Sequence, residues 1–152
     1  MEPKVNFKIR LASPTDLKAI MEIESESFGS DAFGERQMKY LMKSATSLFY
    51  VVETKHTLAG YIILLTRKNS YQMRIYSIAV LSLLRGKGVG QHLIDFALKT
   101  AEKKSKSSLK LEVRTTNSGA IQLYERNKFK PVNIIPDYYH DGCDALVMKR
   151  KI

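Results

Sequence analysis

The chain has 152 residues, of which 44% are hydrophobic and 26% charged, as is ordinary for a soluble globular protein. This length can bury one substantial core, so we expect a single domain over residues 1–152. The longest strongly apolar stretch, residues 61–65, is far shorter than the roughly 18 residues of a membrane span. Because Cys143 is the only cysteine and residues 1–4 lack the apolar run of a secretory signal, we expect a cytoplasmic protein.

The net charge of +10 is the one unusual bulk property of the chain. It favours anionic partners such as a phosphorylated cofactor, RNA or an acidic peptide. A lysine-rich solvated surface explains the same number, since the cations are spread along the chain without interleaved aromatic residues. Charge by itself therefore does not choose between these interpretations.

The first half of the chain predicts two helices among four strands. Residues 7–11 alternate like a half-buried strand, and Ser13, Pro14 and Asp16 are typical of a helix start. That helix breaks at Phe28-Gly29-Ser30-Asp31, and a short second helix is expected over 35–43. Three further strands are expected over the ranges 48–52, 58–66 and 73–80, and their short links predict an antiparallel meander.

In the second half, strands alternate with helices. Apolar residues at four-residue spacing predict a helix that starts at Gly88 and ends near the polar stretch 103–108, and a strand follows over 109–114. A helix between neighbouring strands makes them parallel, so strands 73–80 and 109–114 form a parallel pair. The remaining elements expected are a helix capped by Asn117 and ending at Asn127, and strands over 129–135 and 143–148. The predicted fold is α+β, a mostly antiparallel sheet with a central parallel pair and about four helices.

The segment Arg85-Gly86-Lys87-Gly88-Val89-Gly90 lies between the first parallel strand and the following helix. Glycines allow the backbone to approach a ligand, and a helix start presents unpaired N–H groups to an anion. The segment lacks the Gly-Lys-Ser/Thr of a nucleotide-triphosphate loop and the sixth-position glycine of a dinucleotide loop. It fits the pattern Arg-x-x-Gly-x-Gly, although a basic turn before a helix would look the same.

This loop resembles the acetyl-CoA loop of the GNAT acetyltransferase superfamily. Residues 111–117 and 120–129 resemble the "LEVR…N…AI.LYE..GF" signature of the protein N-terminal acetyltransferase branch, which includes the ribosomal-protein alanine N-acetyltransferases (RimI) and archaeal relatives. Tyr138-Tyr139 and residues 144–148 resemble the last hairpin of that branch, so the resemblance runs from Phe7 to the C-terminus. It implies transfer of acetyl from acetyl-CoA to a primary amine, foremost the N-terminal α-amine of proteins, ribosomal proteins included.

The resemblance also implies roles for individual residues. Glu112 would be the base, and strand alternation turns it away from Leu111 and Val113, although a solvated strand glutamate would look alike. Tyr124 would be the acid that protonates the leaving thiolate, and its alternative as a core aromatic is compatible with that role. The backbone at the end of strand 73–80 and the backbone of the glycine loop would hold the cofactor. The Val80 N–H would also stabilise the oxyanion that develops during the reaction. These cofactor residues are Ile78, Ala79, Val80, Arg85, Gly86, Lys87, Gly88, Val89, Gly90 and Asn117.

Several of these assignments have simpler alternatives. Asn117 is equally explained as a helix cap, and Arg85 and Lys87 as solvated cations. By resemblance, the segment from Phe28 to Phe33, with Tyr138 and Tyr139, would line the peptide groove. Many relatives carry Pro-Trp where this chain has Gly29-Ser30, which leaves the first-residue pocket unassigned. His56, His92 and His140 lack metal-ligand spacing, so no metal is expected.

Two other functions fit the same residues. One is a GNAT enzyme that acts on a small amine or a lysine side chain. The other is a non-catalytic basic module that binds RNA or the ribosome and keeps CoA only as a structural ligand. The ribosome is also a candidate partner of an N-terminal acetyltransferase.

Overall fold

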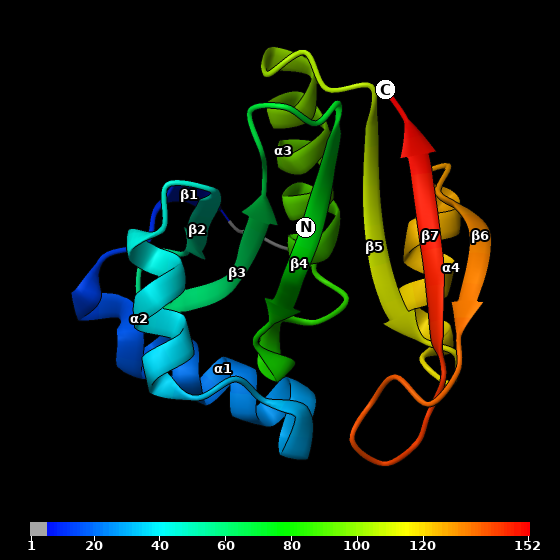
Figure 1. Cartoon of the computed structure of the whole chain (residues 1–152). Helices are drawn as coiled ribbons and strands as arrows, with labels where there is room; N and C mark the ends of the chain where they lie inside the picture. The colour runs from blue at the N-terminus through cyan, green and yellow to red at the C-terminus, as the bar shows by residue number, and fades with distance from the viewer. Residues whose placement is uncertain (1–5) are drawn as a thin grey trace, which may run out of the picture. The chain divides into compact units, whose positions relative to one another are not determined.

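A computed structural model describes residues 6–152 of the chain, which contain seven strands and four α-helices (Figure 1). Residues 1–4, on which the expectation of no secretory signal rests, lie outside the described part. No helix within the described part is long and apolar enough to cross a bilayer. The helices are α1 (Leu17–Phe28), α2 (Glu35–Lys43), α3 (Val89–Lys103) and α4 (Ser118–Arg126). The strands are β1 (Lys8–Leu11), β2 (Ser47–Glu53), β3 (Leu58–Leu65), β4 (Gln72–Val80), β5 (Ser108–Arg114), β6 (Lys130–Ile135) and β7 (Ala145–Lys151).

The chain divides into two compact units. Unit 1 holds the residues up to Leu64 together with Ser77–Leu93, and unit 2 holds Leu65–Tyr76 together with Ile94–Ile152. Strand β4 and helix α3 each contribute one part to either unit.

The strands hydrogen-bond in the order β1-β2-β3-β4-β5-β7-β6. Strands β4 and β5 are parallel, with Arg74 opposite Lys110, whereas the pairs β1–β2, β5–β7 and β6–β7 are antiparallel. The predicted fold class and the central parallel pair are therefore confirmed. Helix α2 has the predicted bounds, and the other elements differ from prediction by a few residues at their ends.

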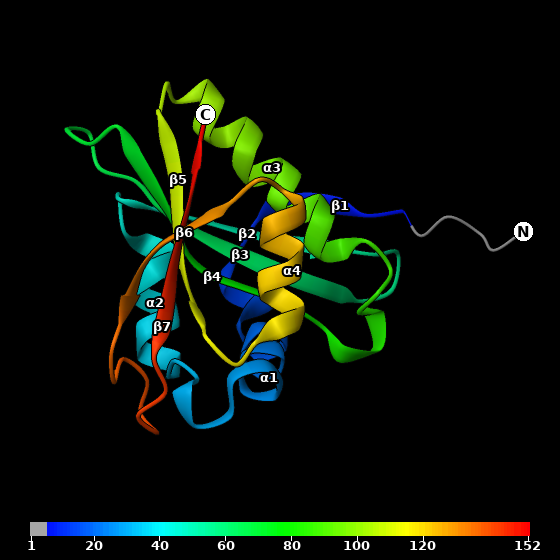
Figure 2. The same ribbon diagram turned by 90° about the vertical axis from the view of Figure 1, so that its right-hand side faces the viewer.

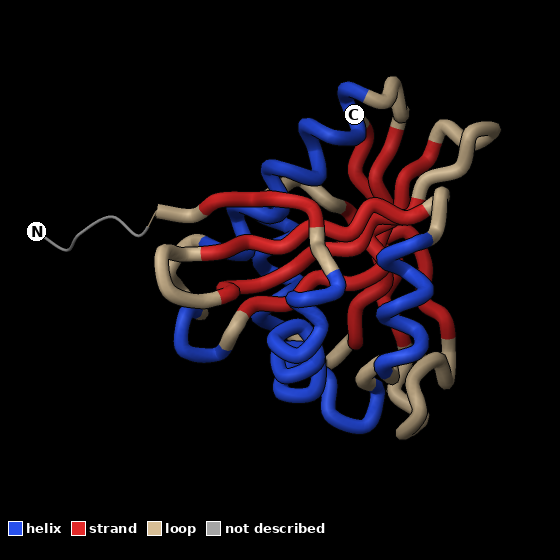
Figure 3. The backbone as a smooth tube through the Cα atoms, turned by 90° about the vertical axis from the view of Figure 1, so that its left-hand side faces the viewer, coloured by secondary structure: helices blue, strands red, loops and turns tan. Residues whose placement is uncertain are grey.

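Unit 1 is built on strand β3, which is apolar along nearly its whole length and buried on both faces. Helix α2 packs on β2, and α1 lies beside α2 (Figure 1). In Figure 3, β1 is the first red strand after the N-terminal segment, and it pairs with β2. The buried hydrophobic residues of this unit include Ile20, Ile23, Met38, Leu41, Phe49, Val51, Tyr61, Ile62, Ile63, Leu64, Val89 and Leu93.

Unit 2 is built on the ladder β5–β7–β6, with α4 against one face (Figure 2). Alternation along β5 buries Leu109, Leu111 and Val113. We call the opposite side of these strands, together with the same side of β4 over residues 72–76, the open face. Glu112 lies on the open face, as its alternation with Leu111 and Val113 predicts.

The last strand begins two residues later than predicted, at Ala145 rather than at Cys143. The Cys143 carbonyl accepts the backbone N–H groups of Tyr138 and Tyr139, both at 3.1 Å. This carbonyl is therefore used within the β6–β7 connection. The expectation that Cys143 is a strand residue was wrong for that reason.

Gly60 provides a test of the packing of β3 against β4. A Cβ atom at Gly60 would lie 2.5 Å from the Ala79 carbonyl oxygen, a backbone atom, whereas a Cβ at Gly119 of α4 meets nothing within 4 Å. We expect Gly60→Ala to lower the free energy of unfolding by roughly 1–3 kcal/mol. Gly119→Ala should be neutral or stabilising by up to about 1 kcal/mol, because alanine favours a helix. Urea unfolding of both variants measures this, and equal stabilities would contradict the close approach.

Candidate active site

The glycine loop after β4 has the backbone geometry that an anion site needs. Gly86 and Gly88 have φ angles of +77° and +88°, which side-chain-bearing residues rarely adopt. Lys87 and both glycines are exposed, and α3 begins at Val89 with its first N–H groups at the end of the loop. The exposed glycines, the adjacent cations and the helix start fit the pyrophosphate of a CoA cofactor.

Helix α1 holds the start of this loop. The Glu26 carboxylate accepts the Ser82 backbone N–H at 2.7 Å, and Arg85 donates to the Ser27 hydroxyl at 3.4 Å. The Ser82 hydrogen bond is also the main reason that the pKa of Glu26 lies below its usual value. Arg85 is thus partly engaged by α1, and its contact with a phosphate stays a prediction.

The end of β4 is fixed by its neighbour β3. Ala79 is buried and Ile78 and Val80 are half-buried, while the Leu81 N–H donates to the Ala59 carbonyl at 2.8 Å. Their binding of a pantetheine arm stays a prediction.

Glu112 lies between two cations on the open face. The Arg74 Nε donates to its Oε2 at 2.9 Å, and the Lys110 Nζ lies 3.5 Å from its Oε1. The Glu112 side chain is only 8% exposed. Both carboxylate oxygens therefore face a positive charge, and Lys110 is the more distant partner.

Arg74 is a residue of this site that the sequence did not indicate. Its guanidinium also donates to the Tyr138 hydroxyl at 3.3 Å and lies over the ring of Tyr76. One guanidinium therefore binds both Glu112 and Tyr138, two of the predicted site residues. The only signal would have been the parallel register that places Arg74 opposite Lys110.

Tyr124 is a buried core residue, which agrees with its interpretation as a core aromatic. Its ring packs on Phe129 with centroids 5.8 Å apart. Burial, and secondarily the nearby Tyr139, raises the pKa of the Tyr124 phenol well above its usual value. The phenol therefore keeps its proton at neutral pH, as a proton donor must, and the donor role itself stays a prediction.

The other predicted residues fall into two groups. The Asn117 side chain accepts the Ala120 N–H at 3.2 Å, so the helix-cap interpretation is confirmed, and its cofactor contact stays a prediction. Tyr138 and Tyr139 pack edge to face, and Arg114 lies over the Tyr139 ring at 4.4 Å. Phe28 is the last residue of α1 and is partly exposed.

Glu24 is a second residue that the sequence did not indicate. It lies on α1, is 1% exposed, and accepts hydrogen bonds from the Tyr61 hydroxyl and from the Phe33 backbone N–H at 3.2 Å. Burial raises the pKa of Glu24, and burial with the adjacent carboxylate raises the pKa of Tyr61. Glu24 thus fixes one end of the segment 28–33 that the sequence assigned to the peptide groove.

A metal-binding cluster or a surface hollow could have indicated a second candidate site. Within residues 6–152 no group of histidine, cysteine and acidic residues is arranged to hold a metal ion. A shallow hollow runs along α1 and is lined by residues between Pro14 and Glu26, with Glu35. None of the predicted site residues lines it.

Comparison with known proteins decides the family. The model of the acetyltransferase (GNAT) family matches residues 17–129, about three quarters of the chain. The chain belongs to the GNAT family. This GNAT protein is therefore an acetyl-CoA-dependent N-acetyltransferase, in agreement with the sequence-based resemblance.

Relatives of this GNAT enzyme include N-terminal acetyltransferases. It is 32% identical to an N-alpha-acetyltransferase of Sulfolobus acidocaldarius, over 95% of this chain and 92% of the relative. The crystal structure of the ribosomal-protein-S18-alanine N-acetyltransferase of Escherichia coli matches with a TM-score of 0.87 and 27% identity, over 97% and 94% of the two chains. Ard1 of Thermoplasma volcanium matches with the same TM-score and identity, over 96% and 97%.

The buried Glu24 predicts a pH-dependent stability difference. The pKa of Glu24 is higher in the folded protein than in the unfolded chain, so its protonation stabilises the fold. This stabilisation is complete at pH values below the unfolded pKa, and it is lost as pH rises through the folded pKa. Glutamine does not titrate, so the unfolding free energy of Glu24→Gln minus that of the wild type should rise as pH increases from 4 to 8. Urea unfolding across this range measures the difference. Exposed Glu22→Gln on the same helix is the control, and a pH-independent difference for Glu24→Gln would contradict the account.

Proposed function

We propose that this GNAT enzyme acetylates the N-terminal α-amino group of proteins, with Glu112 as the proton acceptor and Tyr124 as the proton donor. One observation carries the proposal. Glu112 is the only acidic residue of β4, β5, β6 and β7, and Arg74 holds it on the open face together with the Tyr138 hydroxyl. A carboxylate and a partly exposed aromatic residue are thus joined on one surface.

The first requirement of the reaction is removal of a proton from the acceptor. An α-amine has a pKa of about 8 and is mostly protonated at neutral pH. In this proposal Glu112 accepts that proton, directly or through one water. Arg74 keeps the carboxylate in place at Oε2, and the incoming ammonium takes the position of the more distant Lys110 at Oε1.

The second requirement is stabilisation of the leaving group and the oxyanion. Acetyl-CoA supplies the thioester carbonyl as acetyl donor. The Tyr124 hydroxyl, whose raised pKa keeps it protonated, would donate its proton to the CoA sulfur as the thioester C–S bond breaks. With acetyl-CoA bound, the Val80 N–H would stabilise the oxyanion that forms at the thioester carbonyl, and the N–H groups of the loop from Arg85 to Gly90 would hold the pyrophosphate.

The relatives support the α-amine as the acceptor. One is named an N-alpha-acetyltransferase and one a ribosomal-protein-S18-alanine N-acetyltransferase. Tyr138, Tyr139 and Phe28 would contact the first residues of the peptide. We propose that residues 1–152 work as one cytoplasmic domain, and ribosome association stays a prediction.

The proposal predicts which substrates and which side chains matter. Peptides with a free N-terminus and no lysine should be acetylated, and the same peptides with a blocked N-terminus should not. Glu112→Gln and Tyr124→Phe should each lower kcat by about 10²-fold or more, because each removes one proton transfer. Mass spectrometry of the peptides and release of free CoA thiol measure both effects.

Exposed Glu102→Gln on α3 removes the same charge and is the control, expected to keep wild-type activity. Acetylation confined to lysine in blocked peptides, or to small amines, would overturn the α-amine assignment. Wild-type rates in both Glu112→Gln and Tyr124→Phe would overturn the catalytic assignment. RNA binding without any turnover would favour the non-catalytic module.

A further inference from the structure

Four cations lie side by side across the open face of unit 2. The strand registers place Arg74 opposite Lys110, Lys110 opposite Lys149, and Lys149 opposite Lys130. Residues directly opposite each other on paired strands project to the same face. Arg74, Lys110, Lys149 and Lys130, from β4, β5, β7 and β6, thus form one transverse line, which we call the cation row.

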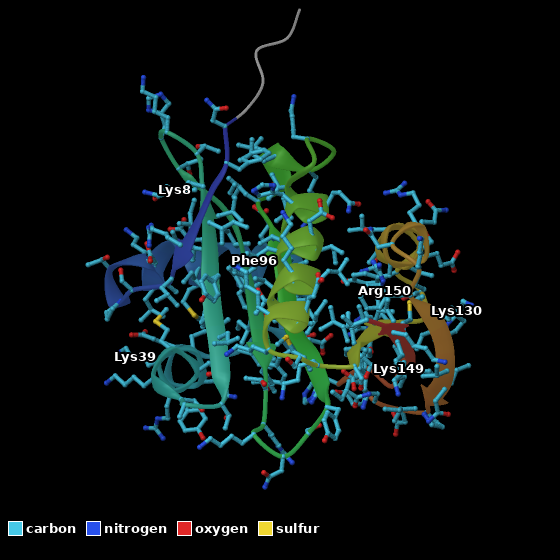
Figure 4. The ribbon with its side chains drawn as sticks, turned by 90° about the horizontal axis from the view of Figure 1, so that it is seen from above. Lys8, Lys39, Phe96, Lys130, Lys149 and Arg150 are labelled. Carbon is cyan, nitrogen blue, oxygen red and sulfur yellow. The ribbon has the colours of Figure 1, made fainter. Side chains whose placement is uncertain are left out.

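The cation row is poorly neutralised by the protein itself. Arg74 and Lys110 share the single carboxylate of Glu112. Within the described residues neither Lys149 nor Lys130 has an acidic partner. Figure 4 shows Lys149 and Arg150 on opposite sides of β7, and Arg150 is used there to donate to the Asn127 carbonyl. Like charges directly opposite each other disfavour a sheet, so an anion over Lys149 and Lys130 would relieve a built-in repulsion.

The row begins beside the proposed proton acceptor. Neighbouring strands are about 4.8 Å apart, so the row extends roughly 14 Å from β4 to β6. An extended peptide advances about 3.3 Å per residue. A peptide whose amine lies at Glu112 and whose chain follows the row therefore passes Lys149 and Lys130 within about its first five residues.

We infer that the cation row selects acceptor proteins that carry acidic side chains at residues 2–5, counted with the N-terminal residue as residue 1. This inference rests on the proposed function, and it narrows the substrate class. Strongly basic N-terminal segments are repelled by the same row. An RNA partner is less well matched over Lys149 and Lys130, because β6 and β7 contain no aromatic residue on which a base would stack.

Steady-state kinetics on three peptides tests this inference. The peptides share one first residue and carry acidic, uncharged or basic side chains at positions 2–5. For the wild type we expect the lowest KM with the acidic peptide and the highest with the basic one. Exposed ion pairs each contribute little, so losing two of them in the double variant Lys130→Gln/Lys149→Gln should raise KM for the acidic peptide by about two- to thirtyfold. Raising the salt concentration to about 0.5 M should shrink the wild-type preference, since salt screens exposed charges.

Two further variants make the test specific. Lys104 is an exposed lysine directly after α3, so Lys104→Gln removes one charge outside the row and should keep the wild-type order of KM values. Lys130→Glu/Lys149→Glu should reverse the order, so that the basic peptide has the lowest KM. Thermal unfolding checks that each variant is folded.

The outcomes separate this inference from the proposed function. Equal KM values for the three peptides, or a preference that the row variants leave unchanged, would overturn the role of the row and leave N-terminal acetylation standing. Acetylation of none of the three free peptides would overturn the proposed function and the inference with it. Loss of RNA binding in the row variants, without any change in KM, would assign the row to nucleic acid and overturn the inference.

Discussion

The ion pair between Arg74 and Glu112 is the interaction on which the proposed chemistry of this GNAT enzyme depends. It joins the two strands of the parallel ladder and holds the only acidic side chain of four strands in place. A carboxylate that is 8% exposed would be costly to bury without such a partner. Because the same guanidinium binds the Tyr138 hydroxyl, one side chain sets the position of both the proposed base and a proposed peptide contact.

Local sequence patterns predicted two features of the candidate site that the structure shows. Alternation along β5 indicated the face of Glu112, and a glycine-rich segment before a helical repeat indicated the loop at Gly86 and Gly88. Arg74 was not predictable in this way, because its role follows from a strand register between residues 38 positions apart in sequence. The cation row was hidden for the same reason. Its members look like scattered lysines until the pairing of β5, β7 and β6 aligns them.

Helix α1 shows a second limit of sequence reasoning. Its apolar spacing predicted an amphipathic helix, but the functions of its acidic residues depend on tertiary partners. Glu24 fixes the segment that contains Phe33, and Glu26 fixes the start of the glycine loop through Ser82. Tyr124 packs in the core and Asn117 caps a helix. These structural roles explain both residues fully, and they are compatible with the catalytic and cofactor-binding roles proposed for them. Residues that stabilise the fold of this enzyme therefore also position segments of the proposed site.

If Glu112 takes the proton from the acceptor amine, replacing Glu112 should matter most at a pH where that amine is protonated. The measurement is the ratio of kcat/KM for the wild type to that for Glu112→Gln on a free N-terminal peptide between pH 6 and 10. Above about pH 8 the amine loses its proton to water without help. The ratio should be about 10² or more near pH 6.5 and should fall at least about tenfold by pH 9.5. A ratio that stays constant across this range, or that is near one throughout, would contradict this role of Glu112.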